Sequence, residues 1–295
     1  MYTECRLCAR SCGANRSEGK AGFCKMTDKI YIAGADLHFF EEPPISGTRG
    51  SGTVFFVGCS LGCIYCQNRE ISRGSCGIQL SVHELANEFL SLKNRGAHNI
   101  NLVTPTHYIP SIREAVAIAR ERGLNLPIVY NTSSYETSES LDIIRDSVDV
   151  WLPDLKYYKK ETSSKYSFAN DLPDVSRRAI EKMVSFAPEA KFSSDGIMTS
   201  GVIVRILLLP GHVAEAKLNL KYLADSFGDK IYISLMSQYT PIGDMPAPLD
   251  RRVTRREYSE LVDYAVKLGI ENAFIQDISS ASDVYIPKCC KGEEQ

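Results

Sequence analysis

Residues 51–66 read SGTVFFVGCSLGCIYC, and this stretch decides the fold because it joins a predicted strand to a loop with three cysteines. Residues 53–57 are almost continuously apolar, as expected of a parallel strand buried on both faces. Cys59, Cys63 and Cys66 follow at C-x3-C-x2-C spacing. Three thiolates on one short loop can reach three corners of a cubane iron–sulfur cluster and leave its fourth iron without a protein ligand. A structural zinc site usually has four ligands and a ferredoxin supplies a fourth cysteine, so the loop favours a metal centre with an open position.

Outward from this stretch, apolar runs of strand length alternate with amphipathic segments. The further predicted strands are residues 100–103, 126–130, 148–152, 202–209 and 231–235, with a weaker one at 273–275. Three predicted helices, 81–96, 111–123 and 254–269, begin with a capping box at Ser81, Ser111 and Thr254 and end at a glycine. Strands alternating with helices predict βαβ units. Six or seven such units favour an α/β fold with a partial (β/α)6 TIM-type barrel over a small doubly wound sheet.

Composition excludes several classes of protein. The chain has 295 residues, and its 34 Lys+Arg against 36 Asp+Glu give a net charge of −2, so no strong field favours nucleic acid. We expect no secretory signal and no membrane span, and therefore a cytoplasmic protein without nucleic-acid or membrane partners. Ten cysteines are many for such a protein, and seven of them fall within the first 66 residues. Clustered cysteines in a chain of this size indicate metal binding or redox chemistry.

The N-terminal cysteines form a second group. Cys5, Cys8, Cys12 and Cys24 lie in CRLCARSCGANRSEGKAGFC, and four thiolates can close a metal site completely. Zinc and a fully ligated iron–sulfur cluster both remain open, the first as a structural site and the second as an electron relay. We therefore expect a metal-binding lobe at 1–36, a connector at 37–50, the barrel at 51–280 and a tail at 281–295. Cys76, Cys289 and Cys290 are expected to be unpaired thiols.

Two other features bear on a site. Residues 156–174 form a polar insertion after the fourth predicted barrel strand, which is either a solvated loop or a substrate contact. Arg205 interrupts the apolar run 202–209, and a charge in a buried strand needs an anion beside it. We therefore expect Arg205 to face the barrel interior.

The three-cysteine loop resembles that of the radical S-adenosylmethionine (SAM) superfamily. The resemblance extends from Cys5 to about Pro241, and the words EEPPISG (41–47), SGTVFFVGC (51–59) and CIYCQN (63–68) are similar to the pyruvate formate-lyase-activating-enzyme-like branch. It implies that Cys59, Cys63 and Cys66 hold a [4Fe–4S] cluster whose open iron chelates SAM. Reduction of the cluster then cleaves SAM to a 5′-deoxyadenosyl radical.

The resemblance also implies a SAM site along the strand ends. Tyr65 matches the aromatic position near the adenine, and 236–239 would line the adenosine pocket. The Gly-Gly-Glu that binds the SAM amine is missing, and Thr104, Thr106 and His107 stand in its place. Thr132, Asp154 and Lys156 match residues that hold SAM and a monovalent cation, whereas Asn131, followed by Thr132 and Ser133, replaces an aspartate. Arg205 matches an arginine near the SAM carboxylate.

The resemblance implies an oxidoreductase with a low-potential reductant, flavodoxin or ferredoxin, as partner. Its substrate would be a backbone glycine of a glycyl-radical enzyme, and another peptide or a small molecule is the alternative. Two alternative functions belong to other classes of protein. An iron–sulfur electron-transfer protein would need fully ligated clusters, and a zinc-organised binding module would leave the three-cysteine loop unexplained.

Overall fold

A computed structural model describes residues 1–74 and 76–277. Its central feature is a ten-stranded sheet with seven neighbouring parallel strands. In spatial order these are β2 (Ser51–Phe56), β4 (Ile100–Val103), β5 (Ile128–Thr132), β6 (Val150–Pro153), β8 (Met198–Leu207), β9 (Tyr232–Met236) and β10 (Ala273–Ile275). This mostly parallel α/β architecture confirms the predicted fold class, and the predicted strands match within a few residues.

Three antiparallel strands were not predicted. β1 (Ile30–His38) pairs with β2, β3 (Ile78–Leu80) pairs with β1, and the short β7 (Lys191–Phe192) pairs with β8. β1 alternates buried and partly exposed residues only at its start, so it lacks the continuous apolar pattern that marks the parallel strands. Because β1 belongs to the sheet, residues 30–36 lie outside the irregular N-terminal lobe to which the sequence assigned them.

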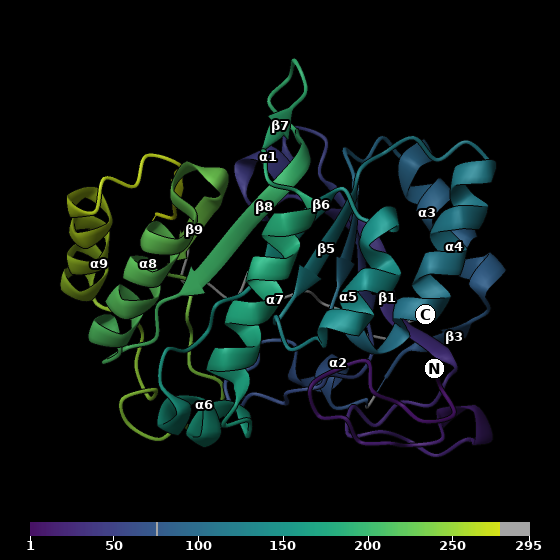
Figure 1. Ribbon diagram of the computed structural model, residues 1–295, viewed down its shortest axis with the longest axis horizontal. Helices are drawn as coiled ribbons and strands as arrows, with labels where there is room; N and C mark the ends of the chain where they lie inside the picture. Colours follow the sequence, from purple (N-terminus) through teal and green to yellow (C-terminus); the bar gives the residue numbers. More distant parts are fainter. Residues whose placement is uncertain (75, 278–295) are drawn as a thin grey trace, which may run out of the picture.

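Helices cover one face of the sheet (Figure 1). They are α3 (Val82–Asn94), α4 (Ile109–Glu121), α5 (Ser138–Ile144), α7 (Leu172–Phe186), α8 (Val213–Phe227) and α9 (Arg255–Lys267). The capping boxes at Ser81 and Thr254 are present. The one predicted at Ser111 is wrong, because α4 begins two residues earlier with Pro110 in its first turn, and the Ser111 hydroxyl instead contacts the Tyr2 hydroxyl at 2.9 Å.

Short elements mark the two ends of the parallel strands. The helix α1 (Pro43–Ser46) lies at their amino ends, whereas α2 (Arg69–Ser72), α6 (Lys160–Ser167) and the N-terminal lobe lie at their carboxyl ends (Figure 1). The remaining pieces are single turns of 3-10 helix at Arg16–Glu18, Thr106–Tyr108, Arg145–Ser147 and Gly228–Lys230. Residues 156–174 are therefore not one loop: α6 and the start of α7 lie within them.

The core fills the space between sheet and helices with large apolar and aromatic side chains. Trp151 packs between Tyr130 and Phe186, and both Trp151 and Tyr130 are almost completely buried. None of the described helices is long and apolar enough to cross a membrane. Cys76 is disulfide-bonded, so the expectation of an unpaired thiol there is wrong. Cys289 and Cys290 lie outside the described residues.

Candidate functional site

The three-cysteine loop follows β2 through a turn that requires glycine. Gly58 has φ +92°, and a Cβ there would lie 2.4 Å from Cγ of Met26 and 2.8 Å from the carbonyl oxygen of Cys24. A larger residue would therefore clash as well as adopt a strained backbone. At the point where it leaves β2, the loop therefore packs directly against the N-terminal lobe.

Hydrogen-bond donors surround the sulfurs of this loop, whose three cysteines are all free. The backbone N–H of Leu61 lies 3.4 Å from Cys59 Sγ, and the Ser167 hydroxyl donates to Cys63 Sγ at 2.9 Å. Burial raises the pKa of the Cys66 thiol, and hydrogen bonds from the Ser72 side chain and the backbone at Asn68 offset part of that rise. Donors aimed at sulfur stabilise thiolates, which is the form that binds iron.

Burial opposes these donors at Cys63 as well. It raises the pKa of that thiol to about 12, with Lys156 opposing the rise. Since metal binding displaces the thiol proton, a buried thiol of this kind binds metal with proton release rather than titrating on its own. The donor set therefore fits an iron–sulfur cluster. Within residues 1–74 and 76–277, no three His, Cys, Asp or Glu side chains are already grouped as ligands of a single metal ion.

A cavity of about 580 Å³ opens beside this loop, within the range of small-ligand sites. Its walls come from the cysteine loop, from the β1–β2 connection and from the carboxyl ends of the strands. Its lining residues include Glu41, Glu42, Cys63, Tyr65, Cys66, Asn131, Asp154, Lys156, Arg205, Ser234, Met236, Gln238 and Tyr239. The chain thus brings together five of the candidate cofactor residues and two of the three cysteines.

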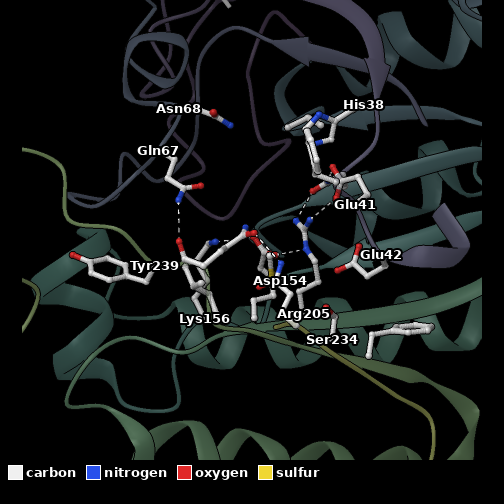
Figure 2. A pocket seen from close by; sticks show the side chains of 18 of the residues that line it. His38, Glu41, Glu42, Gln67, Asn68, Asp154, Lys156, Arg205, Ser234 and Tyr239 are labelled. Atoms are coloured by element: carbon white, nitrogen blue, oxygen red, sulfur yellow. Dashed lines mark hydrogen bonds and ion pairs between the residues drawn. The ribbon is translucent and has the colours of Figure 1, made fainter. Parts of the chain in front are cut away.

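Arg205 is the centre of a buried ionic network in this cavity (Figure 2). Its Nε donates to Asp154 Oδ1 at 2.8 Å, its Nη2 to Asn131 Oδ1 at 2.5 Å and its Nη1 to Glu41 Oε2 at 3.3 Å. Lys156 Nζ donates to the other oxygen of Asp154 at 2.7 Å. The guanidinium therefore faces the interior with anions beside it, as its position in an apolar strand predicts.

The network fixes the charges of its members. Burial alone would raise the pKa of Asp154, but Arg205 and Lys156 outweigh it and hold that pKa below its usual value. Burial would likewise lower the pKa of Lys156, but Asp154 raises it. Asp154 is therefore an anion and Lys156 and Arg205 are cations at neutral pH, so the cavity presents both signs of charge to a ligand.

Glu41 and Glu42 belong to the site although the sequence did not single them out. They come from the β1–β2 connection, where Asn101 Nδ2 donates to Glu41 Oε1 at 3.1 Å. Glu42 is 7 % exposed, its Oε2 has no hydrogen-bond partner, and burial raises its pKa. The signal in the sequence was two adjacent carboxylates before Pro43 in a connection otherwise rich in aromatic and proline residues.

Aromatic hydroxyls connect the cavity to the cysteine loop. Tyr65 OH lies 2.8 Å from Tyr157 OH, and Tyr157 OH lies 2.7 Å from Ser167 Oγ, the group that contacts Cys63. The ring of Tyr65 packs edge-on against Tyr239. Residues 156–174 therefore contribute to the site through Lys156, Tyr157 and Ser167.

The other candidate residues do not line this cavity. The hydroxyls of Thr106 and Thr132 both donate to Glu136 Oε1, a carboxylate that is 3 % exposed. His107 is buried, its Nε2 lies 2.7 Å from the carbonyl oxygen of Val57, and burial lowers its pKa to about 3. Thr104, with φ +59°, and Ser133 are likewise absent from the cavity wall.

Comparisons with known proteins found a distant relative in sequence and solved structures of similar architecture. The uncharacterized protein MJ0674 of Methanocaldococcus jannaschii is 26% identical over 284 residues, which are 92% of this chain and 77% of that protein. The FeFe-hydrogenase maturase HydG from Carboxydothermus hydrogenoformans superposes with a TM-score of 0.52 and 13% identity over 77% of this chain and 54% of that one. Methylornithine synthase (PylB) gives a TM-score of 0.49 and 18% identity, over 74% of this chain and 60% of that one.

The chain spans 60% of the length of methylornithine synthase and 54% of the length of HydG, and the likeness to HydG concerns the fold alone. A family model of the radical SAM superfamily matches residues 53–217. This range runs from β2 into α8 and contains the three-cysteine loop together with Asn131, Asp154, Lys156 and Arg205. Because the match covers more than half of the chain, the chain belongs to the radical SAM superfamily.

Proposed function

We propose that this radical SAM enzyme abstracts hydrogen from a backbone glycine of a partner protein, with Cys59, Cys63 and Cys66 as the ligands of a [4Fe–4S] cluster. The observation that carries the proposal is the cysteine loop beside a cavity with buried charges of both signs. When bound and reduced, the cluster supplies the electron that cleaves SAM to the 5′-deoxyadenosyl radical, and a low-potential flavodoxin or ferredoxin is the expected donor. The chain itself binds, orients and shields the reactants.

The charges suit the methionine end of SAM, which is a zwitterion. Lys156 and Arg205 offer donors to a carboxylate, and Asp154 and Glu41 offer acceptors to an ammonium group. Since all four side chains are hydrogen-bonded to one another or to asparagine amides, they are held in place before a ligand arrives. Tyr65 and Tyr239 supply the aromatic surface that we propose for the adenine.

A protein substrate is supported by the mouth of the cavity. Phe40 and Ile275 line the cavity and are nevertheless 46 % and 54 % exposed, and the neighbouring Phe39 is 51 % exposed. Exposed apolar side chains beside a cavity are typical of surfaces that contact another protein. A loop that reaches into the cavity would cover them.

A test of the cofactor chemistry needs only the full chain. After anaerobic reconstitution with iron and sulfide, SAM and dithionite should yield 5′-deoxyadenosine, and the Cys59/Cys63/Cys66→Ala variant should yield none. An intact cluster that binds SAM yet forms no 5′-deoxyadenosine would contradict the proposal.

The substrate needs a second experiment. Incubation with a candidate glycyl-radical enzyme should give a glycyl-radical signal in electron paramagnetic resonance, and replacing the target glycine by alanine in that enzyme should abolish it. A second candidate, an amine-bearing small molecule, is favoured by the unpartnered carboxylate oxygen of Glu42. In that case small amines rather than the partner protein should stimulate 5′-deoxyadenosine formation, and Glu42→Gln should remove the stimulation.

A further inference from the structure

Arg16 is a buried cation that has no carboxylate partner among the described residues. Its side chain is completely buried. The guanidinium donates to three backbone carbonyl oxygens, from Nε to Met26 at 3.1 Å, from Nη2 to Thr27 at 2.5 Å and from Nη1 to His107 at 2.6 Å. These bonds engage all three guanidinium nitrogens but leave the charge uncompensated, and a buried charge is costly unless an anion lies beside it.

The groups that can supply this anion are the N-terminal cysteines. Cys5 Sγ lies 3.6 Å from Arg16 Nη1, and Cys24 interacts electrostatically with the same guanidinium. A Cβ built on Gly22 would lie 3.2 Å from Cys12 Sγ and 3.5 Å from Cys24 Sγ, so these two sulfurs are close neighbours. All four N-terminal cysteines are free thiols.

We propose that Cys5, Cys8, Cys12 and Cys24 bind a thiophilic metal as a tetrathiolate centre, and that buried Arg16 balances its negative charge. Four thiolates outweigh the charge of a zinc ion and of an iron–sulfur cluster alike, so either centre is an anion in the lobe. Neutral thiols would leave Arg16 without a counter-charge. The proposal does not depend on the substrate of the enzyme or on its radical chemistry.

The lobe that carries this centre also holds the three-cysteine loop. Arg10, between Cys8 and Cys12, donates from Nε to the carbonyl oxygen of Ser60 at 2.9 Å and from Nη1 to that of Phe168 at 2.6 Å. Ser60 belongs to the three-cysteine loop, and Phe168 follows the serine that contacts Cys63. Together with the contact of Cys24 on Gly58, these bonds make the loop depend on an ordered lobe.

Metal analysis of the Cys59/Cys63/Cys66→Ala variant tests the proposal. This full-length variant, purified anaerobically, should retain either about one zinc or about four irons with sulfide per chain. The first result would identify a zinc site and the second an iron–sulfur cluster. If it retains no more metal than a variant in which Cys5, Cys8, Cys12 and Cys24 are also serine, the proposal is wrong.

Arg16 is tested in the same background by chelator competition. Arg16→Gln removes the charge and should weaken metal retention about tenfold or more, as loss of a group beside metal ligands typically does. Arg16→Lys keeps the charge and should recover most of the retention, whereas Lys20→Gln, which removes an exposed charge from the same lobe, should have no effect. Equal retention in Arg16→Gln and Arg16→Lys would refute the charge-partner role, with circular dichroism confirming that both variants fold.

Discussion

Replacing Arg205 by methionine should destabilise the protein strongly. The guanidinium is bonded to Asp154, Glu41 and Asn131, and the three charged side chains are only 11–19 % exposed. Removing one partner of a buried ion pair costs about 3–5 kcal/mol, because the other partner stays buried and unpaired. Asp154 keeps Lys156 as a partner, but Glu41 keeps only the amides of Asn101 and Asn131. We therefore expect the free energy of unfolding to fall by about 3 kcal/mol or more.

A double-mutant cycle isolates the reason. If the cost comes from an unpaired Glu41 carboxylate, Arg205→Met with Glu41→Gln should be more stable than Arg205→Met alone, with a coupling of about 1–3 kcal/mol. The assay is urea unfolding of the metal-free chain at pH 7.5, with the m-value checked for constancy. A loss below about 1 kcal/mol for Arg205→Met, or additivity of the two substitutions, would refute the buried network.

The pH dependence adds a second constraint on the same network. The pKa of Asp154 is lower in the folded chain than its ordinary value of 3.8, so the folded state binds fewer protons than the unfolded state near that pH. Its contribution to stability is therefore fully present above pH 4 or so and is lost as the pH falls through the folded pKa. The destabilisation by Arg205→Met should shrink over that acidic range.

Three further predictions concern substitutions of single residues. Because burial raises the pKa of Glu42 above 4.5, the free energy of unfolding of the wild type should fall by about 1.4 kcal/mol per pH unit as the pH rises from 4.5 to the folded pKa. In urea unfolding, Glu42→Gln should therefore be more stable relative to the wild type at pH 8 than at pH 5. Ser167→Ala removes a hydrogen bond to Cys63 and should make the cluster potential more negative in a redox titration; an unchanged potential would contradict that contact. Gly58→Ala places a Cβ against Met26 and Cys24 and should lower the free energy of unfolding in urea by about 3 kcal/mol. Gly62 also has a positive φ, +73°, but open space around a Cβ, so Gly62→Ala should lower that free energy by less.

The sequence predicted those parts of the fold that repeat a local pattern. Buried parallel strands carry continuous apolar runs, and Ser81 and Thr254 begin their helices as expected because a capping box is decided within four residues. β1 was missed since its pattern reflects a partner strand and a lobe that local periodicity does not reveal. The same applies to Ser111, where Pro110 starts the helix earlier than the capping pattern indicates.

Site residues divide in a similar way. Arg205 was predictable because a charge inside an apolar strand must meet an anion, but the identity of Glu41 as one of those anions depends on a connection 164 residues away in the chain. Thr106 and Thr132 were placed at the cofactor by resemblance, and in the fold their hydroxyls converge on Glu136. No local pattern predicts that convergence, because it depends on how two strand ends and one loop meet.

The segment from Lys156 to Phe168 has a consequence for how this sequence can vary. It is attached at both ends, through Tyr157 to Tyr65 and through the carbonyl of Phe168 to Arg10, while Ser167 contacts Cys63. An insertion or deletion between these points would displace a group that touches the cysteine loop. Relatives should therefore keep the length of this segment and vary mainly its exposed positions, such as 160, 161, 164 and 165.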